Sequence, residues 1–218
     1  MSRTSLPDSG PQSRRRIGAY GGTFDPPHLG HLIIASEIRA ALELDEVVFI
    51  PAGVPPHKDP AQVSAATDRL AMLRLAVEGN PAFRVDTIEL DRAGRSFTAD
   101  TLAAIHEREP EADLWFIMGS DSLNDLRTWR DPERIVALAR LAVAVRPGWT
   151  PDLDAVVGSV PETAGRIDVL PTPLVDIASH ELRQRVRQDR PIRYLVSDTV
   201  ARYIAERSLY RNHHHDPE

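Results

Sequence analysis

Two histidines and two adjacent glycines lie close together in the stretch GAYGGTFDPPHLGHLIIASEIRAAL (18–42). His28 and His31 are three residues apart, so both imidazoles can lie on one face of a helix that starts here. A helix N-terminus favours anions through its free amide groups and its dipole. Gly21 and Gly22 let a phosphate or a sugar approach the backbone closely. The pattern predicts a polyphosphate-binding turn.

Other interpretations of this stretch are weaker. A glycine pair alone also serves turn geometry. His28 and His31 could form half of a metal site, but the chain has no cysteine and no suitably spaced carboxylate that would complete it, so we expect no protein-bound metal. The chain has neither G-x-G-x-x-G nor G-x-x-x-x-G-K-[ST], which disfavours a dinucleotide dehydrogenase and a P-loop ATPase.

Lysine occurs once, as Lys58, among 26 basic residues, and it follows His57 in PAGVPPHKDP. An ammonium group is a compact point charge, whereas a guanidinium group is a wide fork, so the two are not interchangeable at a phosphate. Codon bias toward arginine could also leave one lysine by chance. The sequence alone leaves both explanations open.

The residues that position this turn alternate between two patterns. Short β-branched or aromatic runs (EVVFIPA, FRVDTIEL, DLWFIMG, LAVAVRPG, RIDVLPT) are separated by segments of helical period (ATDRLAMLRLAVEG, TADTLAAIHER, DPERIVALA). This order predicts an α/β fold with a doubly wound, mostly parallel sheet and helices on both faces. We expect residues 17–20 to form the first strand, Gly21 and Gly22 the turn after it, and 29–42 a helix. Ligands of such sheets bind at the carboxyl ends of the strands, near the switch point.

The length of 218 residues favours one domain, here 16–211, although two small domains are not excluded by length. Residues 1–15 are polar and rich in proline and serine, which predicts a disordered leader. Residues 212–218 are predicted to be a flexible tail, in which the histidines at 213–215 face solvent and bind no metal.

Composition excludes several classes of partner. The net charge of −6 gives no overall field that favours nucleic acid or an anionic membrane. No apolar run approaches the roughly 20 residues of a membrane span, and no apolar signal core follows the N-terminus. The absence of cysteine is compatible with a reducing compartment. We therefore expect a cytoplasmic protein that binds neither membrane nor nucleic acid.

The stretch GGTFDPPHLGH resembles the G-G-T-F-D-P-x-H-x-G-H signature of the nucleotidylyltransferase superfamily. PPHK, SFTADTL, MGSDSLNDLRTW and the ending IASHELRQRV…YLVSDTVARYIAERSLY resemble, in order and spacing, the bacterial nicotinate-mononucleotide adenylyltransferases. The resemblance covers about residues 17–211. It implies a Rossmann-like fold with a small C-terminal helical part. It also implies adenylyl transfer from ATP, accompanied by Mg²⁺, to nicotinate mononucleotide, which gives deamido-NAD and pyrophosphate.

The resemblance also implies roles for individual residues. The residues implied in catalysis contact phosphates and are His28, His31, Lys58 and Arg183. The residues implied in ATP binding are Gly21, Gly22, Thr23, Phe24, Gly119, Asp121, Ile177 and Ser179. The residues implied in mononucleotide binding are His57, Thr98 and Trp129. In isolation, Asp121 and Thr98 also fit helix N-caps, and Trp129 also fits the core.

One motif departs from the family pattern. The C-terminal phosphate motif usually reads I-S-S-T-x-I-R, whereas residues 177–183 of this chain read IASHELR. Two hydroxyls are absent; Ser179 is expected to cap a helix, and Arg183 keeps the positive charge. His180 could reach a phosphate or turn to solvent. Three alternatives therefore stay open: nicotinamide mononucleotide as acceptor, another phosphorylated acceptor, or a nucleotide-binding module without turnover. The sequence does not address the oligomeric state.

Overall fold

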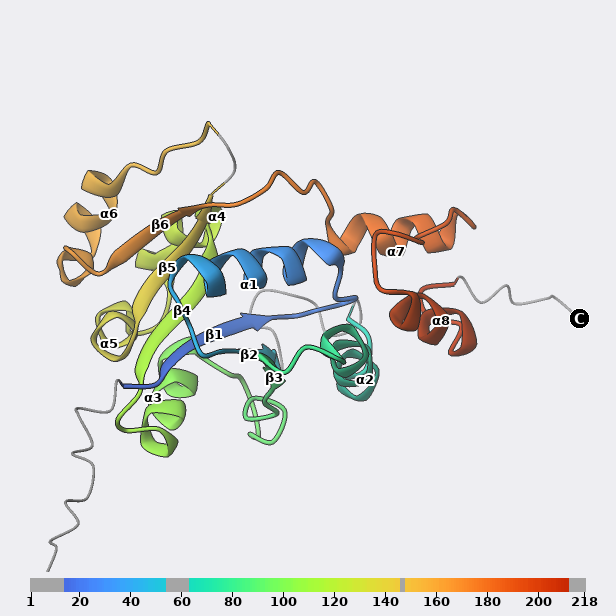
Figure 1. The fold of residues 1–218 in the computed structure, drawn as a ribbon, viewed down its shortest axis with the longest axis horizontal. Helices are drawn as coiled ribbons and strands as arrows, with labels where there is room; N and C mark the ends of the chain where they lie inside the picture. Colours follow the sequence, from blue (N-terminus) through green and yellow to red (C-terminus); the bar gives the residue numbers. More distant parts are fainter. Residues whose placement is uncertain (1–13, 54–62, 146–147, 212–218) are drawn as a thin grey trace, which may run out of the picture.

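A computed structural model describes residues 14–53, 63–145 and 148–211 of the chain. Six strands form one sheet in the order β3-β2-β1-β4-β5-β6, and all neighbouring pairs are parallel (Figure 1). This is the doubly wound order whose switch point lies between β1 and β4. The predicted α/β fold is therefore confirmed. The strands are β1 (Arg16–Gly22), β2 (Glu46–Pro51), β3 (Phe83–Val85), β4 (Asp113–Gly119), β5 (Arg140–Val145) and β6 (Ile167–Pro171).

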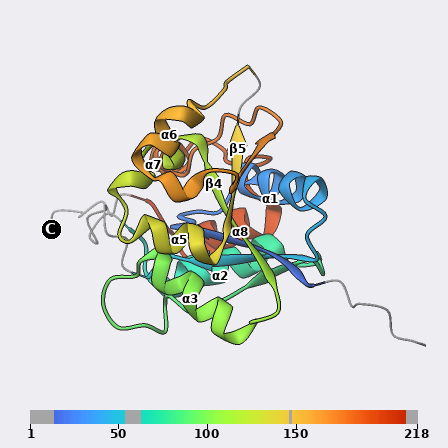
Figure 2. The same cartoon turned by 90° about the vertical axis from the view of Figure 1, so that its left-hand side faces the viewer.

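Helices cover both faces of this sheet (Figure 2). On one face α3 and α5 share a hydrophobic cluster with the strands, and on the other face α1 and α2 do so. The α-helices are α1 (Leu29–Ala41), α2 (Ala66–Val77), α3 (Thr98–Arg108), α4 (Ser120–Asn124), α5 (Pro132–Leu138), α6 (Leu153–Ser159), α7 (Ser179–Arg187) and α8 (Asp198–Glu206); the 3₁₀ helices are η2 (Leu126–Thr128) and η3 (Pro161–Thr163).

Strand β2 shows why an apolar run forms a strand here. All six of its residues are buried. Val48 and Ile50 belong to the cluster on one face, while Val47 and Phe49 belong to the cluster on the other. Side chains alternate across a strand, so a strand covered on both faces is apolar throughout.

Two predicted boundaries were wrong. Gly21 and Gly22 belong to β1, which pairs with β2 as far as Gly22 opposite Pro51, so the turn begins two residues later, at Thr23. The run FRVDTIEL forms a strand only over Phe83–Val85, because the backbone N–H groups of Leu90 and Asp91 bond back to Thr87 in a turn.

The C-terminal helices form the predicted small helical part. Helices α7 and α8 lie beyond α2 at one end of the sheet (Figure 1). A third hydrophobic cluster joins them to α2 through Met72, Leu182 and Val200. This packing brings Tyr210, near the end of the described residues, close to the turn that follows β1.

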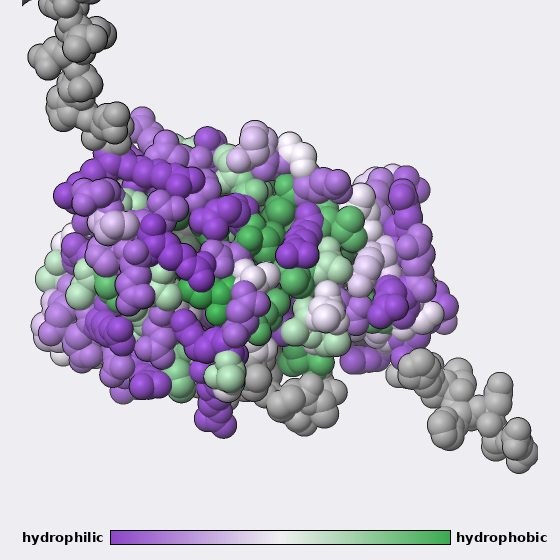
Figure 3. Space-filling view, turned by 90° about the horizontal axis from the view of Figure 1, so that it is seen from below, coloured by the Kyte–Doolittle hydropathy of each residue, from purple (hydrophilic) through white to green (hydrophobic). Residues whose placement is uncertain are grey.

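The surface seen in Figure 3 is mostly hydrophilic, with hydrophobic residues gathered near its centre. Across the described residues, every helix is too short or too polar to cross a membrane. Residues 1–13 of the predicted leader and the predicted tail at 212–218 lie outside the described residues.

Candidate active site

The candidate site lies where the hydrogen-bonded pairing between the two central strands, β1 and β4, ends. Strand β1 pairs with β2 from Ile17 to its end at Gly22, but with β4 only as far as Ala19 opposite Phe116. Each of these two strands continues for three residues beyond that pair, to Gly22 and to Gly119. The carboxyl ends of β1 and β4 therefore border the switch point, which is where ligands of such sheets bind.

A glycine is required at the end of β1 by close packing. A Cβ on Gly22 would lie 2.9 Å from the ring of Phe24, which has only 2% of its surface exposed. Phe24 has a left-handed φ of 49°, and its ring packs edge-on against His31 at 5.0 Å between centroids. The Phe24 side chain therefore supports His31 from inside the protein, and only its backbone remains at the turn.

The two histidines of the signature stack on each other. The ring centroids of His28 and His31 are 3.7 Å apart, with an angle of 29° between the ring planes. His28 lies at the N-cap of α1, and its backbone N–H donates to Nδ1 of His31 at 3.1 Å. Because Nδ1 is the acceptor, the neutral His31 ring carries its proton on Nε2. The backbone thus sets His31 as a donor at its Nε2 atom.

The glycine between the histidines is explained by the stacking. A Cβ on Gly30 would lie 3.0 Å from Nδ1 of His28 and 3.1 Å from its Cε1. Any larger residue would push the His28 ring away from His31. The H-x-G-H spacing therefore combines two needs: a helical offset that brings the rings together and a small residue that leaves them room.

His28 is held as a neutral ring. Its side chain is 8% exposed, and burial lowers the pKa of the imidazole to about 4. At neutral pH the His28 side chain is therefore uncharged.

Acidification is expected to destabilise the fold through His28. The unfolded chain binds a proton below about pH 6.5 and the folded chain only near pH 4, so stability is lost as the pH falls from 6.5 toward 4. The loss at pH 5 is about 2 kcal/mol. Denaturant titrations at pH 7 and pH 5 should show that His28→Gln removes most of this loss. His106→Gln, at an exposed position of α3, is the control, and an equal effect of both variants would contradict the assignment.

Helix α7 places the altered phosphate motif against the turn. Ser179 is the first residue of α7 and does not cap it; Ala178 occupies the N-cap, and Ser179 Oγ donates to the carbonyl of Pro26 at 2.9 Å. The predicted cap was therefore wrong, because the hydroxyl reaches across to the turn. Arg183 Nη1 donates to the carbonyl of Asp25 at 2.8 Å. Ile177 packs with the third hydrophobic cluster, and His180 is exposed.

Strand β4 leads directly into a short helix at the same edge. Gly119 is the N-cap of α4, and Asp121 lies in its first turn with an exposed side chain. The alternative in which Asp121 caps this helix is therefore not observed. Its carboxylate stands at the carboxyl end of β4, beside the opening of the ladder.

Of the residues predicted for the second substrate, Trp129 packs against Phe116 of β4 and Thr98 lies at the start of α3. The ring of Trp129 meets that of Phe116 edge-on at 5.9 Å, and a Cβ on Gly21 would lie 3.7 Å from the Phe116 ring. The Arg130 guanidinium lies over the ring of Phe97, 4.5 Å from its centroid, which ties the segment of Trp129 to the segment of Thr98. Thr98 is the first residue of α3, with Phe97 at the N-cap, so Thr98 does not cap this helix.

Sequence reasoning missed two buried charged residues beside the turn. Asp25, 2% exposed, accepts hydrogen bonds from the Tyr210 hydroxyl and the Ser64 backbone N–H. Arg69, also 2% exposed, donates to the carbonyls of Thr23, Gly53 and Ser64. A charged residue in an apolar helix, as Arg69 is in α2, was the available signal.

A partly buried acid adjoins this cluster. Glu89 accepts from the Thr101 hydroxyl at 2.8 Å, and burial raises the pKa of its carboxyl. Thr101 belongs to SFTADTL, so this motif holds the Glu89 carboxylate as well as carrying Thr98. His57 and Lys58 lie outside the described residues.

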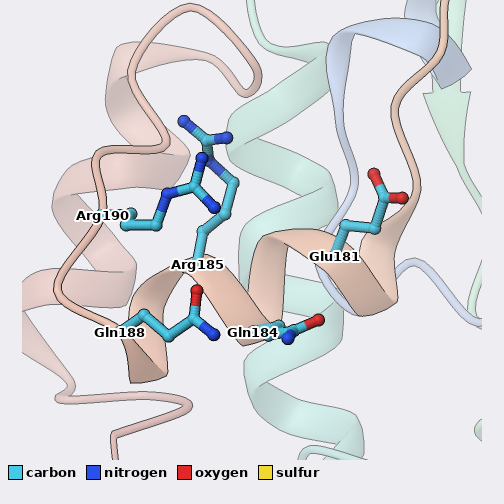
Figure 4. Close-up of a pocket in the computed structure, with 5 residues that line it drawn as sticks. All are labelled: Glu181, Gln184, Arg185, Gln188 and Arg190. Atoms are coloured by element: carbon cyan, nitrogen blue, oxygen red, sulfur yellow. The ribbon is translucent and has the colours of Figure 1, made fainter.

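A surface hollow on α7 is a different feature (Figure 4). It encloses about 300 Å³, and no residue predicted to bind substrate lines it. Arg185, one of its residues, already donates from Nε to the carbonyl of Pro191. The residues around it are Glu181, Gln184, Arg185, Gln188 and Arg190.

Comparison with known proteins defines the class. The cytidylyltransferase-like family model matches residues 19–188. A solved structure titled as the Plasmodium falciparum nicotinic acid mononucleotide adenylyltransferase complexed with NaAD superposes with a TM-score of 0.75. It covers 90% of this chain and 98% of that one at 19% identity, and so supports the fold.

Two relatives define the family more narrowly. A protein of Thermomicrobium roseum, named a probable nicotinate-nucleotide adenylyltransferase, is 45% identical over 196 residues, covering 90% of this chain and 92% of the relative. A protein of Roseiflexus with the same name is 48% identical over 195 residues, covering 89% and 98%. Within the cytidylyltransferase-like class, the chain belongs to the nicotinate-nucleotide adenylyltransferase family.

Proposed function

We propose that this protein transfers the adenylyl group of ATP to nicotinate mononucleotide and releases pyrophosphate. The observation that carries the proposal is the stacked pair His28 and His31 at the N-terminus of α1, beside the open ends of β1 and β4. The names of the relatives in Thermomicrobium roseum and Roseiflexus support it. So does the printed ligand NaAD of the Plasmodium falciparum structure.

The reaction is an in-line displacement at phosphorus. An oxygen of the mononucleotide 5′-phosphate attacks the α-phosphorus of ATP and forms a new P–O–P bridge. The bond from the α-phosphorus to the α,β-bridging oxygen breaks, and pyrophosphate leaves with that electron pair. The nucleophile is already anionic, so the protein needs no base. Positioning and stabilisation of charge supply the catalysis.

Each residue around the turn has a role in this proposal. His31 donates from Nε2 to the phosphates whose charge changes during the reaction. Neutral His28 holds His31 by stacking and by its backbone N–H. Arg183 adds positive charge. The backbone of Gly21, Gly22, Thr23 and Phe24, together with Gly119, Ile177 and Ser179, borders the nucleotide.

The remaining proposed roles concern the ribose of ATP, the metal ion that accompanies ATP, and the residues His57 and Lys58. The exposed carboxylate of Asp121 can accept bonds from two ribose hydroxyls of ATP. Nucleotidyltransferases generally use ATP with a divalent metal, and we propose that the ion here is Mg²⁺, entering as a complex with the ATP phosphates. Mg²⁺ keeps several waters and is commonly bound through substrate phosphates. His57 and Lys58 would reach the same phosphates.

The residues proposed to bind the acceptor would let the enzyme distinguish nicotinate mononucleotide from nicotinamide mononucleotide. Trp129 would stack on the pyridine ring with little regard to its substituent. Hydroxyl and N–H donors near Thr98 would form charge-assisted hydrogen bonds with the carboxylate of nicotinate, which are about twice as strong as neutral hydrogen bonds. The amide of nicotinamide would present its own N–H₂ to those donors and leave groups unpaired, at about 1–3 kcal/mol each.

We therefore expect a preference for nicotinate mononucleotide of at least about tenfold in kcat/KM. The test measures pyrophosphate release from MgATP with nicotinate or nicotinamide mononucleotide supplied in turn. Trp129→Ala should lower kcat/KM for both mononucleotides by a similar factor. Thr98→Val should instead reduce the ratio of kcat/KM for nicotinate mononucleotide to that for nicotinamide mononucleotide. Equal or better use of nicotinamide mononucleotide by the wild type would refute the choice of acceptor. Absence of pyrophosphate with either would favour the binding module without turnover.

A further inference from the structure

The C-terminal helices hold the turn that carries the catalytic histidines. Arg183 and Ser179 of α7 donate to two consecutive carbonyls of this turn, those of Asp25 and Pro26. The partners are more than 150 residues apart in the chain. Two adjacent backbone carbonyls are thereby fixed from outside, directly before His28.

A third backbone contact lies at the other end of the turn. The N–H of Leu29, the first residue of α1, donates to the carbonyl of Leu195 at 2.9 Å. The first N–H groups of a helix have no partner inside the helix. Here the segment between α7 and α8 satisfies one of them and fixes the start of α1.

The most distant contact is made by a side chain. Tyr210 Oη donates to Oδ1 of Asp25 at 2.6 Å, across 185 residues of sequence. Oδ2 of the same carboxylate accepts from the backbone N–H of Ser64 at 3.0 Å. A carboxylate that is 98% buried is stable only when its oxygens are bonded, so the phenol is a structural requirement of Asp25. Burial, followed by the charge of Asp25, raises the pKa of the Tyr210 phenol and keeps it a donor.

The backbone at Tyr210 is also unusual. Its φ is +66°, a left-handed value that is rare for a bulky side chain and costs conformational energy. Such a conformation persists where surrounding contacts determine it. In this case it directs the ring toward the signature turn, where the hydroxyl bonds Asp25 and also lies 3.8 Å from the sulfur of Met72.

We propose that Tyr210 is a positioning residue for adenylyl transfer, acting through Asp25 on the backbone that sets His28 and His31. The inference rests on the proposed function for the reaction that it serves. Displacement at phosphorus depends on alignment, and a small shift of the donor groups lowers the rate without removing any group that touches the substrate. The turn at Tyr210, near the end of the described residues, is therefore part of the proposed active-site architecture.

A matched pair of variants tests this role. Tyr210→Phe removes the hydroxyl that bonds Asp25. Tyr203→Phe removes an equivalent hydroxyl, which donates to Oδ1 of Asp68 at 2.8 Å but does not reach the turn. We expect Tyr210→Phe to lower kcat about tenfold, with the KM for nicotinate mononucleotide unchanged within about twofold. Tyr203→Phe should keep the wild-type kcat, and it should lower the melting temperature less than Tyr210→Phe does, because Asp68 is also paired with Arg207 at 3.4 Å. Equal kcat values for the two variants would overturn the proposal.

A second measurement does not depend on activity. The ¹⁵N signals of the His31 ring and the His28 amide report the bond between them. They should shift in Tyr210→Phe and stay at wild-type values in Tyr203→Phe. Unchanged signals in Tyr210→Phe would refute the positioning role even if the enzyme is active. If the wild type forms no product, the proposed function fails, and these signals still decide whether Tyr210 positions the turn.

Discussion

His31→Ala is expected to lower kcat for adenylyl transfer by about a hundredfold or more, with a much smaller change in the KM for ATP. His31 is set as a donor at Nε2 because its Nδ1 accepts from the His28 backbone N–H. A donor aimed at charge that develops in the transition state is worth about 10²–10³ in rate. Steady-state kinetics with MgATP and nicotinate mononucleotide give both constants.

His31→Asn separates chemistry from support of the fold. The amide oxygen of asparagine can take the place of Nδ1 as acceptor for His28, but no donor then occupies the position of Nε2. We expect the asparagine variant to be nearly as slow as the alanine variant and closer to the wild type in melting temperature. A lower ATP affinity with unchanged kcat in both variants would assign His31 to ground-state binding.

The sequence predicts a turn with two histidines after the first strand because these signals are local. Alternating strand and helix patterns predict parallel strands whose carboxyl ends share one edge, and the spacing of His28 and His31 predicts their common face. The strand order, which shows that β1 and β4 border the switch point, came from the structure. The structure adds why the residue between them is Gly30, whose Cβ would collide with His28. That contact depends on the stacked arrangement of the two histidine rings, which sequence composition does not predict.

The partners of Asp25 could not be predicted from the sequence. Asp25 stands inside the signature, yet its bonds reach Ser64, 39 residues away, and Tyr210, 185 residues away. A short polar residue near proline is ordinary in a turn, so its type reveals no such partner. The same limit explains Ser179, predicted as a cap from its neighbours but bonded to Pro26 across the fold.

Arg69→Met is expected to reduce the free energy of unfolding by about 3 kcal/mol or more. Arg69 is buried in α2, and its three guanidinium nitrogens donate to the carbonyls of Ser64, Thr23 and Gly53, within 3.1 to 3.2 Å. The three acceptors belong to three different segments of the chain. Methionine keeps similar bulk but supplies no donor, and a hydrogen bond from a charged group is worth about 1.5–3 kcal/mol.

Asp25 adds to the loss of free energy of unfolding that is expected for Arg69→Met. Burial lowers the pKa of Arg69, and the charge of Asp25 opposes this shift by favouring the charged guanidinium. Arg69→Met removes this attraction, although the oxygens of Asp25 stay bonded to Tyr210 and Ser64. Arg69→Lys should recover part of the loss, because an ammonium restores the charge but cannot reach three separate carbonyls in the geometry of a fork.

Arg74→Met provides the comparison within the same helix. Arg74 lies in the last turn of α2 with an exposed side chain, so its replacement is expected to change stability by less than about 0.5 kcal/mol. Urea titration of the three variants measures the differences. Similar midpoints for Arg69→Met and Arg74→Met would show that the three carbonyls are satisfied without the guanidinium. A clear difference would mean that one buried cation joins the end of β1, the end of β2 and the start of α2, so that the strand ends bordering the site depend on a residue that touches no substrate.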